Sequence, residues 1–403
     1  MTNDPAALHP AALPHAEAGR VRGARLAVRA VFFCNGLAMA TWVVNIPRVR
    51  DQLDLNPATV GTALLGIAVG SLIAMPRAGH LTARYGTRRV TLVSGTLVAL
   101  ALLLPFVATS LWGLGAALLA VGAANGVMDV AMNAQGVVVE RVGRKPVMSS
   151  FHAAFSFGTL VGALMGSVLL GVGLAALPHA LLVSGIFLAV LAGVARLLLP
   201  RQAEAPGAGS TGAKAHPAQS TSQNRLMVVL LGILCFLGML GEGAIGDWSG
   251  LYSADVLGVS GALVGAAFTA FTLAMTLARL LGDGWRSRYG DPRVVTLGAL
   301  LSGAGLLLGL LTLNPVLAAL GFLVVGIGVA NVVPVLYGTA GHAFAGKGIA
   351  QVASIGYAGF LAGPPLIGYV SQATSLRVGM LVIGVSLLTV GICAPLVYRR
   401  LAR

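Results

Sequence analysis

The sequence predicts an all-α membrane protein with twelve transmembrane helices in two pseudo-symmetric six-helix bundles. The 403-residue chain is 57% hydrophobic and 9% charged, with a mean hydropathy of +0.89, whereas soluble domains carry about 25% charged residues. Apolar runs of about 20 residues, the length that crosses a bilayer, recur along the chain. One long polar stretch divides these runs into two sets of six. These observations exclude an ordinary soluble domain.

In chain order, residues 1–25 predict a disordered tail, and the stretch 199–225 has the Ala, Gly, Ser, Gln and Pro content of a linker. The linker separates an N-terminal bundle at 26–198 from a C-terminal bundle at 226–398, and residues 399–403 form a short tail. The expected helices are 27–46, 58–77, 90–108, 112–139, 147–172, 176–198, 226–247, 258–281, 293–312, 315–339, 350–371 and 376–398.

The basic residues predict the orientation in the membrane. With the N-terminus inside, 23 of the 26 Lys and Arg residues fall on the inner side, and only Arg48, Arg50 and Arg377 fall outside. Short cytoplasmic loops carry such an excess. We therefore expect a bacterial-type inner-membrane protein with both termini in the cytoplasm. The net charge of +14 follows from this topology and from contact with anionic lipid, which argues against a nucleic-acid partner.

A carboxyl group lies deep in the fourth apolar segment. The run begins at Leu111 and carries no charge before Asp129. Asn125, Asp129 and Asn133 are spaced four residues apart and therefore share one helix face. Ionisable groups at this depth usually line a pathway, and burial favours the neutral form of a carboxyl, which suits reversible protonation. The alternative is a structural carboxyl bonded to a neighbouring helix.

Other polar groups at depth are candidates for the same pathway. His152 is expected near the level of Asn133, either in a carboxyl–imidazole relay or bonded to a backbone carbonyl or Glu140. Glu242 lies between two glycines, which allow close backbone approach. Amides and aromatic rings that could hold a sugar-like ligand, or serve as contacts between helices, are Asn45, Trp42, Asn331 and Tyr357.

The two halves repeat a short motif. The sequence RYGTRRV at 84–90 recurs as RYGDPRV at 288–294, an offset of 204 residues. Asn125 and Asn331 also stand in similar Val-Gly surroundings. A six-plus-six repeat predicts a substrate site between two halves that rock about it.

These features resemble the major facilitator superfamily over all twelve helices. The loop GHLTARYGTRR at 79–89 resembles the superfamily's G-x-L-x-D-R-x-G-x-R-R loop, with Ala83 where an Asp is usual. A narrower resemblance, to the MosC-like and YbjJ-like branch, rests on DVAMN at 129–133, SSFH at 149–152 and GEGAIGDWS at 241–249. The superfamily resemblance implies gating roles for Gly79, Arg84, Gly86, Arg88 and Arg89, and in the second half for Arg279, Asp283 and Arg288.

The resulting hypothesis is a secondary active transporter that moves a small polar, sugar- or cyclitol-like solute by alternating access, coupled to protons. The alternatives are proton-driven efflux of a drug or secondary metabolite, and a non-transporting membrane sensor or scaffold. No phosphate loop, nucleotide fingerprint, metal spacing or catalytic set is present in the sequence, so we expect no cofactor and no enzyme activity. A monomer is expected by analogy with the fold.

Overall fold

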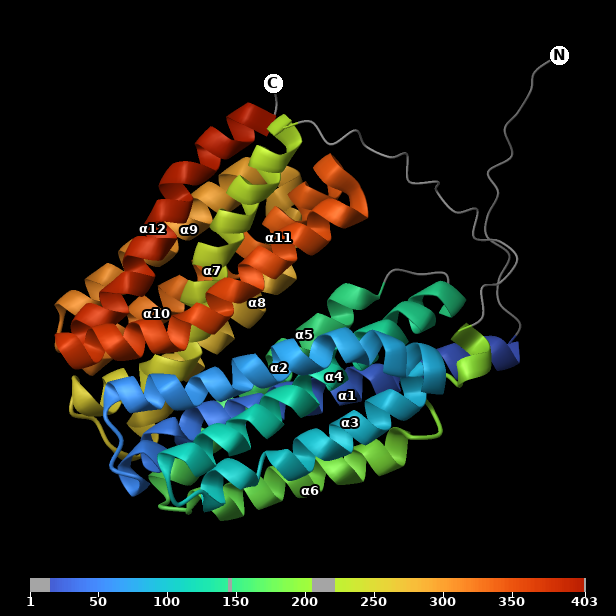
Figure 1. Cartoon of the computed structure of the whole chain (residues 1–403), viewed down its shortest axis with the longest axis horizontal. Coiled ribbons are helices and arrows are strands. Elements are labelled where there is room, and N and C mark those ends of the chain that lie inside the picture. The colour runs from blue at the N-terminus through green and yellow to red at the C-terminus, as the bar shows by residue number, and fades with distance from the viewer. Residues whose placement is uncertain (1–14, 144–146, 205–221, 402–403) are drawn as a thin grey trace.

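The computed structural model describes residues 15–143, 147–204 and 222–401, and within these ranges it contains helices and no strand. Two helical bundles are visible in Figure 1. The N-terminal bundle consists of α1 (His15–Gln52), α2 (Pro57–Tyr85), α3 (Thr87–Ala101), α4 (Leu111–Gly143), α5 (Met148–Gly171) and α6 (Ala176–Val194), with 3₁₀ turns η1 (Leu104–Val107) and η2 (Arg201–Glu204). The C-terminal bundle consists of η3 (Gly261–Gly265) and the helices α7 (Ser222–Asp255), α8 (Ala266–Tyr289), α9 (Asp291–Leu311), α10 (Pro315–Val329), α11 (Val332–Ala373) and α12 (Leu376–Leu401).

Local sequence signals set several helix ends. Asn56 caps α2 by accepting the backbone N–H of Thr59, with Pro57 in the first turn, and Asn314 caps α10 in the same way before Pro315. The expected segment 90–108 is divided into α3 and η1, since Pro105 cannot continue an α-helical hydrogen-bond ladder.

The start of the first helix differs from the expectation. The predicted disordered tail extends to residue 25, but α1 begins at His15. The intervening residues include several Ala and Arg, which favour helix, and no proline interrupts them. The linker prediction at 199–225 falls largely on residues 205–221, which lie outside the described part of the chain.

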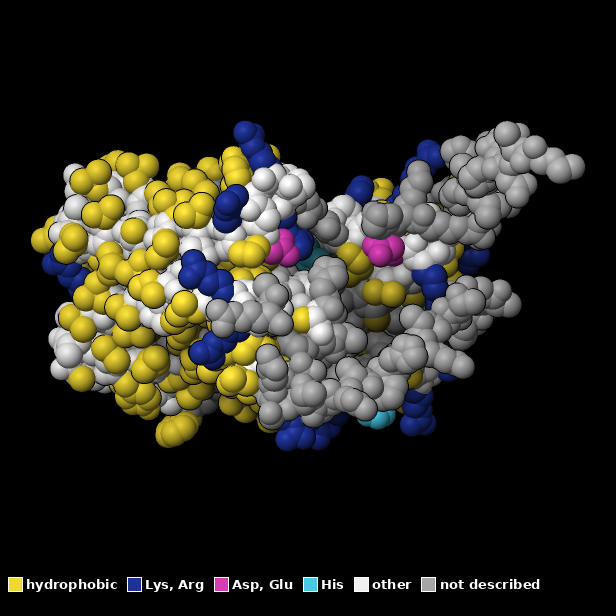
Figure 2. Space-filling view, turned by 90° about the horizontal axis from the view of Figure 1, so that it is seen from above, with side chains coloured by type: hydrophobic (Ala, Val, Ile, Leu, Met, Phe, Trp, Pro, Cys, Tyr) yellow, Lys and Arg dark blue, Asp and Glu magenta, His cyan; other side chains and the backbone are white. Residues whose placement is uncertain are grey.

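In the described residues, eleven helical stretches are long and apolar enough to cross a membrane. Large apolar side chains such as Val93, Leu308 and Leu396 are exposed on them, as expected for contact with lipid. Figure 2 shows that apolar side chains dominate much of the described surface.

The expected helix at 350–371 lies within α11. A straight helix would place Tyr337 and Gly356 about 28 Å apart. Instead, a Cβ added at Gly356 would lie 3.1 Å from the hydroxyl oxygen of Tyr337. The chain therefore reverses direction between these residues, and α11 contributes to two passes, as the separate predictions at 315–339 and 350–371 require.

The helix packing repeats between the bundles. α1 packs on α5, and α2 on α4; correspondingly α7 packs on α11, and α8 on α10. Glycines permit close approach between the bundles: a Cβ added at Gly61 of α2 would lie 2.7 Å from the carbonyl oxygen of Pro364 in α11. The bundles meet at the end opposite the chain termini and spread apart towards the end that carries them (Figure 1).

Candidate functional site

Arg279 joins three helices where the two bundles meet. Its guanidinium donates to the Glu242 carboxylate of α7 at 2.7 Å and to the Ser156 hydroxyl of α5 at 3.2 Å, and a longer bond reaches the Ala330 carbonyl at 3.4 Å. The resemblance implied a gating role for Arg279. In the structure Arg279 lies inside α8, within a stretch long and apolar enough to cross a membrane, as the expected helix at 258–281 requires.

The glycines beside Glu242 allow α7 to pack closely on its neighbours. A Cβ added at Gly243 would lie 2.7 Å from the Phe360 ring of α11, and one at Gly241 would lie 3.0 Å from Leu387 of α12. These contacts leave the Glu242 side chain directed to Arg279. The Arg279 and Glu242 side chains remain 27% and 25% exposed, so the ion pair is only partly buried.

Asp129 and Asn133 form a second polar group on α4. The Asn133 amide donates to the Asp129 carboxylate at 3.2 Å and to its backbone carbonyl at 2.8 Å. Asn125 lies one turn away, and its buried carbonyl oxygen has no hydrogen-bond partner among the described residues. Asp129 makes no ion pair with any residue of the described ranges. The structure thus supplies a half-buried carboxyl with one amide partner, next to an unsatisfied acceptor.

Tyr357 and His152 lie within electrostatic range of these charged groups. Tyr357 of α11 interacts with the charges of both Asp129 and Glu242. His152 of α5 interacts with the charge of Arg279, and its ring meets the edge of Phe32 at 5.4 Å between centroids. Side chains from both bundles therefore converge on one region.

One of the alternatives for His152, a bond to Glu140, is not observed. The Glu140 carboxylate instead accepts the backbone N–H groups of Val147 and Met148 at 2.7 and 3.0 Å, where it caps the start of α5. His152 is exposed and makes no hydrogen bond to the described residues.

Three predicted pathway residues lie elsewhere. Trp42 is buried inside the N-terminal bundle against Phe106. The Asn45 amide shares a 3.0 Å contact with the His179 ring of α6, a buried histidine that the sequence analysis missed because it lies in an otherwise apolar helix. Asn331 donates to the Ala278 carbonyl at 3.0 Å and ties the start of α11 to α8. Each of these groups contacts another element of its own bundle, as the helix-packing alternative expects.

Apart from Arg279, the predicted gating residues whose side chains are described lie at the end that carries the termini. Gly86 and Gly290 occupy matching turns, with φ of 84° and 79°. Arg84 lies over the Tyr85 ring, as Arg288 lies over the Tyr289 ring. The remaining first-half candidates are all exposed or half-buried: Gly79, Arg88 and Arg89. The side chain of Asp283 lies outside the described residues.

Contacts at the opposite end close the space between the bundles. Arg50 of α1 forms an ion pair with Asp255 of α7. The hydroxyl groups of Thr62 and Tyr369 lie 3.1 Å apart, and those of Ser167 and Thr269 lie 3.4 Å apart. Each pair joins one bundle to the other. Together with the deeper Ser156–Arg279 bond, these pairs connect the described parts of the two bundles from this end inward.

Comparisons with known proteins identify the family. The family model of the Major Facilitator Superfamily matches residues 30–267 and 231–403. An uncharacterized MFS-type transporter of Yersinia pestis is 37% identical over 93% of this chain and 96% of its own. The membrane protein MosC of Rhizobium meliloti is 32% identical over 94% of this chain and 91% of its own, which confirms the predicted branch.

Solved structures show the same fold. The crystal structure of a bacterial homolog of the human lysosomal transporter Spinster, inward-facing and unoccupied, has a TM-score of 0.73 at 14% identity, covering 97% of this chain and 98% of that one. The crystal structure of the nucleoside transporter NupG has a TM-score of 0.70 at 13% identity, covering 93% of this chain and 99% of that one. The chain therefore belongs to the major facilitator superfamily, a family of membrane transporters and not of enzymes.

Proposed function

We propose that this transporter moves a small polar organic solute, sugar- or cyclitol-like, by proton-coupled alternating access. The observation that carries the proposal is the Arg279 bridge, which links Glu242 of its own bundle to Ser156 of the other. Charged side chains within a membrane-spanning stretch are costly, and those that occur usually serve binding or coupling. A contact that crosses between bundles must also break when the bundles rock.

The donor and acceptor groups at the site support the proposed solute class. Arg279 and Tyr357 can donate hydrogen bonds, Asp129 and Glu242 can accept them, and the Asn125 amide offers both. Hydroxyl groups both donate and accept, so a polyol can satisfy this mixed set, whereas an apolar drug would leave it unpaired.

The carboxylates at the site support the proposed proton coupling. In the structure Glu242 holds Arg279 by a charge-assisted hydrogen bond. Protonation of Glu242 would weaken that bond and free guanidinium donors for the solute. Asp129, with Asn133 as its hydrogen-bond partner, would act as a second proton acceptor on the opposite bundle.

The bundle arrangement supports an inward-open state, with the termini on the cytoplasmic side as the basic residues indicate. The Arg50–Asp255 pair and the two hydroxyl pairs form the outer closure. In the cycle, these contacts open while the loops at Gly86 and Gly290 approach each other.

The test is proton movement in proteoliposomes that contain an internal pH dye. A panel of sugars, inositols and cationic drugs is added to wild type, to Asp129→Asn and to Asp54→Asn. Asp54 is an exposed loop carboxyl at φ 48°, a conformation that Asn tolerates, so this matched control should behave as wild type.

A pH change that requires a sugar or inositol and is lost only in Asp129→Asn would support the proposal. A response to cationic drugs alone would replace it with efflux. Solute flux without proton movement in wild type would make the protein a facilitator, and binding without flux would favour a sensor.

A further inference from the structure

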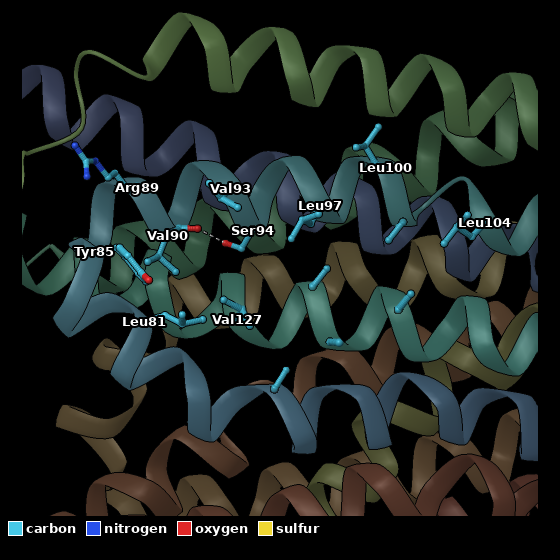
Figure 3. A pocket seen from close by; sticks show the side chains of 15 residues that line it. Leu81, Tyr85, Arg89, Val90, Val93, Ser94, Leu97, Leu100, Leu104 and Val127 are labelled. Carbon is cyan, nitrogen blue, oxygen red and sulfur yellow. Dashed lines mark hydrogen bonds between the residues drawn. The ribbon is translucent and has the colours of Figure 1, made fainter.

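A long apolar groove runs along the outer face of the N-terminal bundle. α3 and α2 form its walls and α4 its floor, and its volume is about 760 Å³. Figure 3 shows its lining side chains spread along α3 from Arg89 to Leu100 and on to Leu104 of η1. Val93, Leu97 and Leu100 are 61%, 51% and 50% exposed, so the groove opens outward to the side where lipid lies.

The C-terminal bundle carries a second groove at the matching place. It lies among α8, α9 and α10 and has a volume of about 270 Å³. Each of its ten lining residues stands 204 positions after a residue that lines the first groove, as Tyr289 does after Tyr85 and Arg293 after Arg89. This offset is that of the repeated motif. The two grooves therefore belong to the repeated frame of the molecule.

The first groove carries its charged and aromatic side chains at one end, and the second carries the matching Arg293 and Tyr289 together with Asn331. Arg89 and Tyr85 lie together at the end near the Gly86 turn, and Leu104 lies at the far end (Figure 3). Neither groove has an acidic side chain in its lining. An occupant that matches this pattern has an anionic head and an apolar tail.

The length of the first groove also suits such an occupant. The rise of α3 and its extension from Arg89 to Leu104 is about 22 Å. One leaflet of the hydrocarbon core is about 15 Å thick. An acyl chain whose headgroup lies at Arg89 can thus follow the groove through its whole leaflet.

We propose that the two grooves are paired binding sites for anionic phospholipid, one in each repeat. The phosphate accepts hydrogen bonds from Arg89 or Arg293 and from the neighbouring Tyr hydroxyl, and one acyl chain lies in the groove. Basic pockets between membrane helices bind anionic headgroups in this way. A second protein copy would instead leave the arginine without a partner in an apolar contact.

The two sites differ in strength. Trp285 stands at the repeat position of Leu81, and its larger side chain reduces the second groove. The rim of the second groove also carries the Arg286–Asp291 ion pair, whereas the first has the basic residues Arg84 and Arg88 nearby and no acid between residues 77 and 101. The N-terminal groove should therefore bind lipid more tightly.

The test is native mass spectrometry of the detergent-solubilised protein with added phosphatidylglycerol or phosphatidylcholine. Wild type should retain up to two phosphatidylglycerol molecules and prefer them over phosphatidylcholine. Arg89→Gln should weaken phosphatidylglycerol binding about fivefold, the factor expected for one basic residue at an anionic lipid surface. Arg77→Gln, an exposed arginine of α2 outside the groove, is the matched control.

A second variant tests the tail independently. Leu97→Trp fills the groove without removing charge, and it should reduce retention of both lipids, more than Leu301→Trp does in the smaller groove. Equal retention of the two lipids in wild type, or unchanged retention in both Arg89→Gln and Leu97→Trp, would overturn the proposal. A dimer that Leu97→Trp dissociates would also overturn it, because a second copy would then occupy the groove.

Discussion

The two bundles share a frame but not a set of polar site residues. The turns at Gly86 and Gly290, the Arg–Tyr pairs beside them and the two outer grooves recur at an offset of 204 residues. At the same offset, Val333 stands where the first half has Asp129, and Met75 stands where the second half has Arg279. The two halves thus share the residues that shape the backbone. They differ at the positions of the charged site residues Asp129 and Arg279.

This difference has a physical reason. A rocking motion needs two bundles of matched shape, which a repeat supplies. A solute has no such symmetry, so its binding groups must differ from one side to the other. We therefore expect substitutions in the shared frame to act on stability in both halves alike, and substitutions at the site to act on transport from one half.

The largest loss of transport should come from replacing Arg279 by methionine, the residue at the matching position of the first half. Arg279→Met installs the repeat counterpart and leaves Glu242, a partly buried carboxylate, without its partner, at a cost of up to about 3 kcal/mol. Solute uptake in proteoliposomes should fall about a hundredfold. This factor corresponds to the loss of a charged interaction worth about 3 kcal/mol. The double variant Arg279→Met/Glu242→Gln should recover thermal stability but not uptake. Uptake near the wild-type rate in Arg279→Met would remove Arg279 from the site.

Substitutions at Asp129 and at its repeat counterpart Val333 should separate an effect on protein stability from an effect on proton coupling. Val333→Asp buries a carboxyl with no prepared partner, and should destabilise the protein by about 2.5–3.5 kcal/mol. Asp129→Val should leave the melting temperature unchanged or higher while solute-driven proton movement is lost. Thermal unfolding and the pH dye measure the two effects. A lower melting temperature in Asp129→Val would instead give Asp129 a structural role.

The shared frame can be tested at its turns. Gly86→Ala and Gly290→Ala place a Cβ at φ of 84° and 79°, with ψ of 148° and 153°, a region that essentially only glycine occupies. Each should destabilise the protein by about 1–3 kcal/mol, and by similar amounts. Gly185→Ala, where an added Cβ meets nothing within 4 Å, is the control and should be neutral. Clearly unequal effects at the two turns would contradict a common frame.

The smallest effect concerns an ion pair present in one repeat. Arg286 donates to Asp291 at 2.9 Å, while Thr82 and Thr87 stand at the matching positions of the first half. Both partners are about one-third exposed, so Asp291→Asn should cost no more than about 1 kcal/mol. Denaturation at low and high salt would measure it, since screening should reduce the difference from wild type. A larger, salt-insensitive loss would indicate a buried role for Asp291.

Several elements were predictable because they depend on neighbouring residues. Hydropathy located the helices, since a span must satisfy its backbone internally over about 20 consecutive residues. The repeat of RYG fixed the matching turns. The i, i+4 spacing placed Asp129 and Asn133 on one face, where they are hydrogen-bonded. The sequence comparison matched Asn331 with Asn125. The groove residues, which correspond at an offset of 204, match Asn331 with Val127 instead.

The sequence by itself thus determined the membrane class, the six-plus-six organisation, the family resemblance and a carboxyl at depth. Only the tertiary structure decided which polar groups meet. Arg279 finds Glu242 and Ser156 on two other helices, and Trp42 turns away into its own bundle. Such contacts depend on how each helix is rotated and how far it slides against its neighbours. Helical spacing fixes which residues share a face, but not what that face touches.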